Sequence, residues 1–506
     1  MQKTKKTRRN DMSFKRSLAA LLAALQLSLI LASCGETTPD AGNNDTAPAV
    51  QDTSVPVETA PPTEAELRAM VDDELPAKTF GGKTFRIITL DGTKANYIVE
   101  DLTGEAKNDA IHGRNETVES RFDVTLDVVS YVDRHACRAA IQQSFRAGDA
   151  EAFDLVAYHM ADNGANAMTG MYHNLYDVPY INFDKPWWAD SNKEDLTVNG
   201  KCFVAMGDIS INTVSGVWCH LFNKELAADL GADNLYEVVR NGEWTIDYVK
   251  ELAARAYKDV NGDGVQNRGD IFGLGAYKGS AMNTYLWAFD NPIIKNDKDG
   301  VPQYVMDTEK LPNIVVTIVE MYDNMTGIYS CTGSDKTSHE VEFANGNMLL
   351  LTGGFGKLAE MAGTTDFTIG VLPYPKWDTD QKEYLTMVDG GADTIGITLL
   401  ETGEELEFIG IITEALCAES YKQVYPVYYD IMLKNRYADQ PDDAEMIQLV
   451  MDGRVYDLGY VYDNWMAAGF WMQTFAQNNN TNVASYMKKA WPAAQKYYDK
   501  VLDLFQ

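Results

Sequence analysis

Positive charge and histidine are scarce in this chain. Its 506 residues include 43 Lys or Arg and 6 His against 74 Asp or Glu, which gives a formal charge of -31. So acidic a surface repels nucleic acid and anionic lipid, and it tolerates neutral or cationic ligands. We therefore expect no nucleic-acid partner.

Motifs that mark common enzyme chemistries are also missing. The chain has no GxSxG nucleophile turn and no HExxH zinc motif, and its histidines are scattered, with only His159 near a proposed binding site. The stretch TGGFGKL, residues 352–358, resembles a phosphate loop but lacks a Ser or Thr after Lys357. Glycoside hydrolysis needs only two carboxyl groups, so this enzyme class stays open.

The apolar run near the N-terminus is too short for a comfortable membrane span. SLAALLAALQLSLILA, residues 17–32, follows a basic region, which is typical of a secretory signal. The run ends in LASC, which resembles the lipobox of bacterial lipoproteins. The resemblance implies that residues 1–33 are a signal peptide and that Cys34 is acylated. We expect a protein anchored by lipid at the extracellular face of the bacterial cell membrane.

Large hydrophobic residues are rare in the segment that follows Cys34, residues 35–63. Residues 35–63 are rich in Pro, Thr, Ala and Asp and contain no aromatic residue, so they cannot bury enough surface to fold. We predict that residues 34–79 form a disordered tether, with a short helix starting near Thr63. The folded body is expected from Phe80 onward.

Cysteine usage argues against a disulfide framework. An odd number of cysteines in an exported protein leaves at least one thiol free. One or two bridges stay compatible with the remaining five residues, which are Cys137, Cys202, Cys219, Cys331 and Cys417.

The stretch DVNGDGVQNRGD, residues 259–270, has the spacing of an EF-hand calcium loop. Oxygen-bearing side chains fall at the first, third and fifth positions, glycine at the sixth and a carbonyl at the seventh. Asp replaces the usual Glu at the twelfth position, which leaves the affinity open. The predicted ligands are Asp259, Asn261, Asp263, Val265, Asn267 and Asp270.

The segments beside this loop indicate what the calcium would do. Before the loop, Thr245 can cap a helix that places Ile246, Val249, Leu252, Ala253 and Ala256 on one face. After it, IFGLGAYKGS predicts a short strand and turn. A sensor needs helix, loop and helix, so we predict a structural Ca²⁺ ion. The alternative is an acidic surface turn without metal.

Helices alternate with short apolar strands in the first part of the body. Strands are predicted over residues 84–90, 124–129 and 153–158, with helical segments between them. This alternation favours an α/β fold in which helices cover both faces of a sheet.

Seven motifs in order resemble the extracellular solute-binding proteins of ABC importers, family 1, which includes maltose-binding proteins. They extend over the whole body, and they are AFDLVAYHMADNG, NGKCFVAMGDIS, WCHLFNKELAADLG, GEWTIDYVKELA, FANGNMLLLTGGFG, FTIGVLPYPKWD and EALCAESYKQVYPVYYDIMLK. The resemblance implies an α/β, two-lobed, periplasmic-binding-protein-like fold (type II) with lobes joined by hinge crossovers. The first lobe would comprise residues 80–201 and 345–391, and the second residues 202–344 and 392–506.

The resemblance also implies a set of ligand contacts, because sugar sites pair aromatic platforms with polar acceptors. The family's positions match polar or carboxylate residues near strand ends and aromatic residues in the second lobe, and the PWW stretch adds two platforms. With these two platforms, the predicted contacts are Asp91, Tyr158, Asp162, Trp187, Trp188, Asp208, Asn283, Tyr285, Phe355, Trp465 and Trp471.

The predicted function is therefore that of a binding protein and not of an enzyme. It would capture a soluble nutrient, most simply a carbohydrate, by lobe closure and deliver it as a monomer to ABC permease subunits. The alternatives are an exported polysaccharide-acting enzyme and a surface adhesin or sensory receptor with the same fold.

Overall fold

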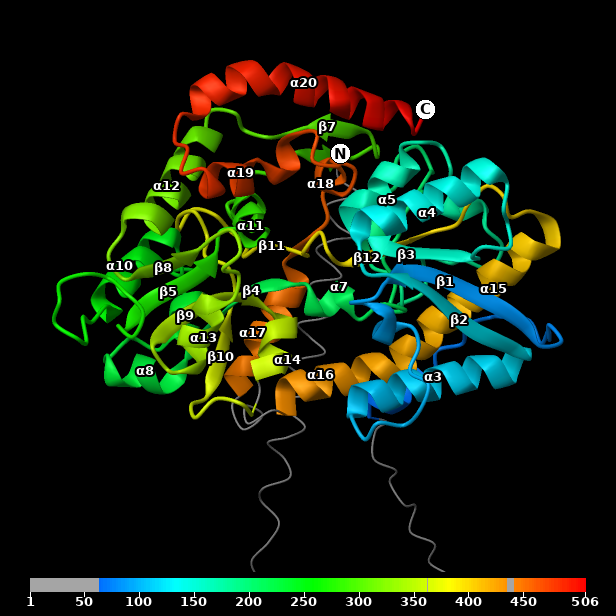
Figure 1. Cartoon of the computed structure of the whole chain (residues 1–506), viewed down its shortest axis with the longest axis horizontal. Helices are drawn as coiled ribbons and strands as arrows, with labels where there is room; N and C mark the ends of the chain where they lie inside the picture. Colours follow the sequence, from blue (N-terminus) through cyan, green and yellow to red (C-terminus); the bar gives the residue numbers. More distant parts are fainter. Residues whose placement is uncertain (1–62, 362, 435–440) are drawn as a thin grey trace, which may run out of the picture. The chain divides into compact units, whose positions relative to one another are not determined.

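A computed structural model describes residues 63–361, 363–434 and 441–506 (Figure 1). The predicted signal peptide, Cys34 and most of the predicted tether lie outside these residues. The helix predicted near Thr63 is α2 (Glu64–Ala69), and the Thr63 side chain caps it. In the part of the chain that the structure describes, no helix is both long and apolar enough to cross a bilayer.

The first sheet has four strands in the order β12-β3-β1-β2. The strand β1 pairs in parallel with β2 and β3, whereas β12 runs antiparallel to β3. Helices cover both faces, as the sequence predicts (Figure 1). The strands are β1 (Lys83–Leu90), β2 (Val124–Tyr131), β3 (Leu155–His159) and β12 (Asp393–Gly396), and the helices around them include α3 (Ala106–Phe122), α4 (Arg134–Ala147), α5 (Met160–Ala167) and α15 (Gly403–Glu419).

The second sheet has five strands in the order β10-β4-β9-β5-β8. The strand β4 is antiparallel to β9 and β10, and β5 is parallel to β9 and β8. We call the parts built around the two sheets the first and second lobe. The strands are β4 (Trp218–Asn223), β5 (Phe272–Tyr277), β8 (Ile328–Cys331), β9 (Met348–Gly354) and β10 (Ile369–Leu372).

The remaining elements surround the two sheets. They are η1 (Lys94–Asn96), η2 (Leu175–Asp177), α6 (Ser191–Glu194), α7 (Asn212–Ser215), α8 (Lys224–Asp229), α9 (Leu235–Arg240), α10 (Ile246–Ala256), α11 (Ala281–Ala288), β6 (Ile294–Asn296), β7 (Pro302–Tyr304), α12 (Leu311–Asn324), α13 (Ser338–Ala344), α14 (Phe355–Met361), β11 (Thr386–Met387), η3 (Ser420–Val424), α16 (Tyr425–Lys434), α17 (Pro441–Asp452), β13 (Arg454–Val455), α18 (Leu458–Val461), η4 (Ala468–Phe470), α19 (Trp471–Gln477) and α20 (Val483–Asp503).

Two chain segments cross side by side between the sheets. The first runs from Asp208 through α7 to β4, and the second runs from β11 to β12. Val217 and Val388 form an antiparallel bridge between them. The carboxylate of Asp393 accepts hydrogen bonds from Asn212 and Ser210, so side chains also tie the crossovers together.

Strand pairing corrects the predicted lobe boundaries. The prediction placed residues 345–391 in the first lobe, but β9 and β10 lie in the second sheet. It also placed residues from 392 onward in the second lobe, but β12 completes the first sheet. The chain returns to the first lobe only after β11. A buried apolar strand such as β9 fits either sheet by its local pattern, and its partner is set by distant residues.

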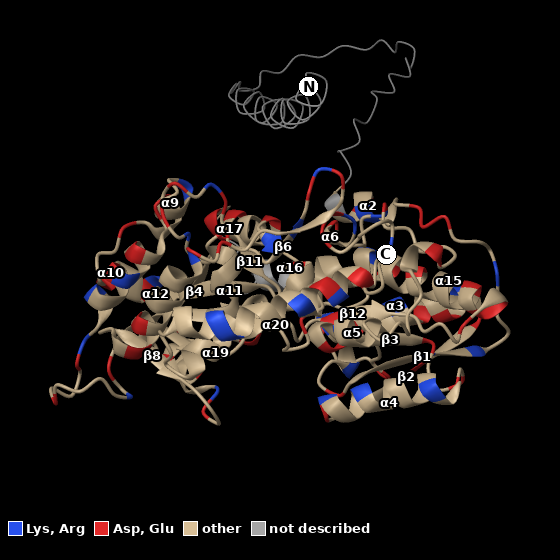
Figure 2. Cartoon of the chain, turned by 90° about the horizontal axis from the view of Figure 1, so that it is seen from above, with Lys and Arg blue, Asp and Glu red and all other residues tan. Residues whose placement is uncertain are grey.

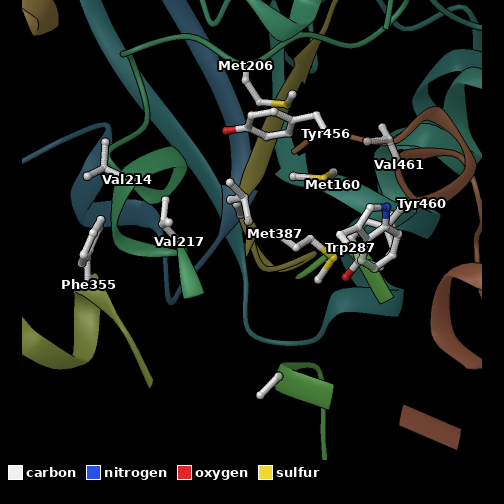
Figure 3. Close-up of a cluster of buried hydrophobic side chains, with 14 of the residues drawn as sticks. Met160, Met206, Val214, Val217, Trp287, Phe355, Met387, Tyr456, Tyr460 and Val461 are labelled. Carbon is white, nitrogen blue, oxygen red and sulfur yellow. The ribbon is translucent and has the colours of Figure 1, made fainter. Parts of the chain in front are cut away.

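One continuous hydrophobic core extends through both lobes. Figure 3 shows part of it, where Met160 and Met206 of the first lobe and Trp287 and Phe355 of the second are buried. The five cysteines of the described residues are all free and buried, so the one or two bridges that the sequence left open do not form among them. Asp and Glu residues, red in Figure 2, are spread along the described part of the chain.

Candidate functional site

A cavity of about 400 Å³ lies where the crossovers meet the second sheet. We call it the cleft. Both crossovers contribute to its lining, together with the ends of three strands and the segment around α13. The lining residues are Asn212, Ser215, Gly216, Trp218, Tyr277, Ala281, Lys336, His339, Glu340, Thr352, Gly353, Gly354, Lys357, Asp389, Gly391 and Ala392.

Strand direction explains why these residues meet at one edge of the sheet. The strands β5 and β9 are parallel, so their carboxyl ends, with Tyr277 and Gly354, lie at the same edge. Because β4 runs antiparallel to β9, its first residue, Trp218, lies directly opposite Gly354. A Cβ at Gly354 would lie only 3.0 Å from the carbonyl oxygen of Val217, so the absence of a side chain lets β9 lie close to the first crossover. The topology therefore opens a cavity at this sheet edge beside the crossovers.

Two partly exposed aromatic rings line the cleft. Trp218 and Tyr277 offer flat apolar faces of the kind on which sugar rings stack. The indole Nε1 of Trp218 is buried and has no hydrogen-bond partner among the described residues. An unpaired buried donor costs free energy, so this N–H favours a ligand with an acceptor such as a hydroxyl oxygen.

The charged groups of the cleft balance in number, with Lys336 and Lys357 against Glu340 and Asp389. Lys357 Nζ forms ion pairs with Glu340 (2.9 Å) and Glu360 (2.6 Å). The N–H of Gly391 donates to the carboxylate of Asp389 over 2.7 Å. The cleft therefore suits a neutral polar ligand better than a strongly charged one.

A thiol and an imidazole lie together at the cleft wall. Cys331 Sγ is 3.2 Å from His339 Nδ1, and both residues are buried. Burial raises the pKa of the Cys331 thiol and lowers the pKa of His339 to about 4. Both groups are thus neutral near pH 7, the reverse of what an activated nucleophile needs. This pair does not support catalysis.

The predicted contacts of the first lobe lie outside the cleft. Asp91 is exposed after β1. Tyr158 is buried, and its hydroxyl donates to the carbonyl of Arg134 over 2.6 Å. Asp162 is buried and pairs with Arg134 (3.0 Å) and Arg138 (3.6 Å). Ion pairs within the first lobe therefore occupy this carboxylate.

Trp465 is the most exposed of the predicted aromatic platforms. Its side chain is 44% exposed, it stacks on Phe470 with a centroid separation of 3.7 Å, and the Arg134 guanidinium lies 5.7 Å from its ring. Both Asn464 and Trp465 have left-handed backbone, with φ of 49° and 63°. Strained backbone of this kind is concentrated at functional segments. Trp465 is thus free to contact a ligand beside the first lobe.

The other predicted platforms are buried in the core. The indoles of Trp187 and Trp188 both donate to Glu414, over 2.8 Å and 2.9 Å. The Asn283 side chain accepts from the N–H of Gln473, over 2.9 Å. The buried side chains that do not reach the cleft also include Tyr285, Phe355 and Trp471. Asp208 lines a different cavity.

The prediction from sequence missed the aromatic rings that line the cleft. Tyr277 ends the strand predicted after the calcium loop, so the rule that ligands bind beyond strand ends would have indicated it. Trp218 begins β4 directly after a crossover, and its partner across the sheet is the distant Gly354. Lys336 and Glu340 carry no local signal.

The predicted calcium loop is compact in the structure. Asp259 accepts from the N–H groups of Gly262 (2.6 Å) and Gly264 (2.8 Å), and Gly264 has a positive φ of 75°. The Asn267 amide nitrogen donates to Asp263 (2.9 Å) and to the carbonyl of Val265 (2.8 Å), between two predicted ligand oxygens. Within the described residues, no group of three His, Cys, Asp or Glu side chains is arranged to hold a metal.

The twelfth loop residue is already engaged in hydrogen bonds. Asp270 accepts from the N–H groups of Val260 and Asn267, each over 3.1 Å, and from the Tyr257 hydroxyl. Asn261 accepts from the N–H of Asp263 over 2.8 Å. The predicted ligand atoms are all oxygens, which is the kind of ligand that a hard cation prefers. To bind the ion, the Asp270 carboxylate would have to give up these hydrogen bonds.

Comparison with known proteins identifies the fold. No protein-family profile matches the chain, and no curated protein sequence matches it. The GacH receptor of Streptomyces glaucescens, solved unliganded and with acarbose, is 16% identical, and the match covers 84% of this chain and 100% of that one, with a TM-score of 0.52. UgpB from Mycobacterium tuberculosis, in complex with glycerophosphocholine, is 14% identical, and the match covers 82% of this chain and 99% of UgpB, with a TM-score of 0.52. A solute-binding protein of Thermotoga lettingae bound with α-D-tagatose is 12% identical, and the match covers 83% of this chain and 100% of that protein, with a TM-score of 0.50. The chain therefore has the two-lobed α/β fold of the ABC transporter solute-binding proteins.

Proposed function

We propose that this chain is the substrate-binding subunit of an ABC importer and that it binds a carbohydrate in the cleft. The observation that carries the proposal is the pairing of Trp218 and Tyr277 around a cavity whose lining also offers polar groups and carries two cations and two carboxylates. Aromatic faces suit the apolar faces of sugar rings, and the amide of Asn212 and the Trp218 N–H suit their hydroxyl groups. The proteins of like fold that are bound with acarbose or tagatose agree with this ligand class.

Lobe closure would complete the site. The cleft is lined by the second lobe and the crossovers, so a closing first lobe would bring its exposed edge towards the ligand. Trp465 and Asp91 are the predicted contacts that stay exposed for this role. Binding involves no chemical change, so no product is expected.

The proposal includes an extracellular location. The LASC sequence at Cys34 supports a lipid anchor, and residues 34–62 are long enough to hold the body some distance from the membrane. The protein would act as a monomer and deliver its cargo to permease subunits. We also propose a structural Ca²⁺ ion in the loop of residues 259–270, with the ligands predicted from sequence.

Calorimetric titration of the chain with mono- and oligosaccharides tests the function. We expect one sugar class to bind at one site, without turnover on prolonged incubation. Trp218→Ala should weaken this binding by about tenfold to a hundredfold, because it removes a ring and a hydrogen-bond donor. Trp218→Phe, which keeps a ring, should lose less.

The exposed ring of Tyr176, which does not line the cleft, provides a matched control. Tyr176→Ala should bind the sugar as the unchanged chain does. Product formation would overturn the binding-protein proposal in favour of an enzyme. Sugar binding that survives Trp218→Ala unchanged would place the site elsewhere.

A further inference from the structure

A second cavity, of about 300 Å³, lies beside the first crossover and shares no lining residue with the cleft. The helix α7 contributes Asn212 and Ser215 to the cleft and Thr213 to the second cavity. Successive helical residues point in directions about 100° apart, so the two cavities meet different sides of α7. The principal side chains that line the second cavity are Arg68, Trp188, Asp208, Tyr421, Tyr425 and Arg454.

Opposite charges face this cavity without touching. Asp208 forms no side-chain hydrogen bond and no ion pair with any described residue. Arg454 Nε donates to the carbonyl of Met451 over 2.8 Å, but its guanidinium forms no ion pair with a described carboxylate. Burial raises the pKa of Asp208 to about 7, and the charges of Arg454 and Arg68 act in the opposite direction. Charges left uncompensated in a partly buried site favour a ligand that pairs with both.

The two charged residues belong to different lobes. The N–H of Asp208 donates to the carbonyl of Trp187 over 2.9 Å, which ties it to the first lobe. Arg454 lies on β13, which pairs in parallel with β11 next to the second sheet. A ligand that contacts both residues therefore bridges the lobes on the side of α7 away from the cleft lining.

Aromatic rings complete the lining. The Arg68 guanidinium lies 4.7 Å from the ring of Tyr421 and 5.3 Å from that of Tyr425, so the rings already face a cation at the cavity wall. The two tyrosines stand at the π-helical turn η3, which interrupts the helix formed by α15 and α16. Such π-helical turns occur frequently at functional sites.

We propose that the second cavity binds a small zwitterion of the amino-acid class, with its carboxylate on Arg454 and its ammonium group on Asp208. The volume lies at the lower end of the range for small-molecule sites, which suits a small ligand. The lining carries two cations, Arg68 and Arg454, and two carboxylates, Asp190 and Asp208, which matches a ligand without net charge. This site is separate from the cleft, and the proposal does not depend on the carbohydrate function.

Calorimetric titration of the full chain with the standard L-amino acids tests the proposal. We expect at least one amino acid to bind at a single site. Acetate and ethylamine, which each carry only one of the two charges, should bind at least about tenfold more weakly. Arg454→Met and Asp208→Asn should each weaken amino-acid binding by about tenfold or more, because each removes one charged partner.

Two further variants keep the result decisive. Arg454→Lys retains the charge and should lose less affinity than Arg454→Met, which separates binding from a general loss of structure. Trp218→Ala alters only the cleft and should leave amino-acid binding unchanged. The proposal is overturned if no amino acid binds, if acetate binds as tightly, or if binding survives both charge removals. Loss of amino-acid binding in Trp218→Ala would assign it to the cleft.

Discussion

Asp393 links the two crossovers, and we expect its ionisation to set part of the pH dependence of folding. Its Oδ2 accepts from the hydroxyl of Tyr97 (2.8 Å), the amide of Asn212 (3.3 Å) and the hydroxyl of Ser210 (3.4 Å). Its buried Oδ1 has no hydrogen-bond partner among the described residues. The residue is 2% exposed, and burial raises the pKa of Asp393 from 3.8 to about 7. The folded chain thus holds this proton more tightly than the unfolded chain does.

The sign of the effect follows from this difference. When the pKa is higher in the folded state, the contribution to stability is fully present below the unfolded pKa and is lost as pH rises through the folded pKa. For a group that shifts from 3.8 to about 7, the free energy of unfolding should fall by about 2–3 kcal/mol between about pH 5 and about pH 8.

Urea unfolding of the unchanged chain and of Asp393→Asn over this pH range measures the effect. The variant keeps an acceptor oxygen for the three donors but cannot ionise. Buried carboxyl groups elsewhere, such as Glu414, whose pKa burial also raises to about 7, act equally in both proteins and cancel in the difference. Parallel stability curves for the two proteins would refute the reasoning, because they would mean that Asp393 does not change its protonation in this range.

Three other perturbations test the first-lobe edge, the core and the loop. Trp465→Ala should weaken sugar binding in titration by up to about tenfold, since the exposed ring contributes stacking, and unchanged affinity would remove it from the site. Asp457→Ala should lower the free energy of unfolding in urea by about 4 kcal/mol or more, because four buried donors lose their acceptor. The donors are Trp287 Nε1 and the N–H groups of Ile293, Ile294 and Gly459. A loss below about 1 kcal/mol would contradict this. Excess Ca²⁺ should raise the melting temperature, because a ligand at a hundred times its dissociation constant stabilises the folded state by about 2.7 kcal/mol. A chelator should reverse the rise. Asp263→Asn should abolish this response while Asp297→Asn, in another acidic turn, retains it, and equal responses would exclude the loop.

Local patterns predicted local elements well. The helix α10 begins after Thr245, whose hydroxyl accepts from the N–H of Tyr248, and its buried face is the one that the spacing predicts. The signals for such a helix lie within one or two turns of each residue. Three strands of the first sheet, β1, β2 and β3, were likewise predicted, although β3 begins at Leu155, two residues later than expected, and the fourth strand, β12, was not predicted.

Sheet membership and the cleft depend on contacts between distant residues. Trp187 and Trp188 look like sugar platforms in sequence, but Glu414, more than 200 residues away, accepts both indole N–H groups and holds the rings in the core. Trp218 lines the cleft opposite Gly354 of the distant strand β9. Neither partner is visible in the local pattern, so family resemblance predicted the fold but not which aromatic residues line the cleft.

The crossovers connect the cleft to the stability of the whole body. The side chain of Asn212 lines the cleft and also donates to Asp393, so a ligand oxygen that accepts from this amide competes with the carboxylate. Donors to Asp393 lower its pKa, and the loss of one raises it further above the bulk value. Ligand binding that engages Asn212 is therefore linked to proton uptake near neutral pH, and by reciprocity a lower pH favours the bound state. The same buried carboxyl group that joins the two lobes thus makes the pH dependence of folding and of binding run in the same direction.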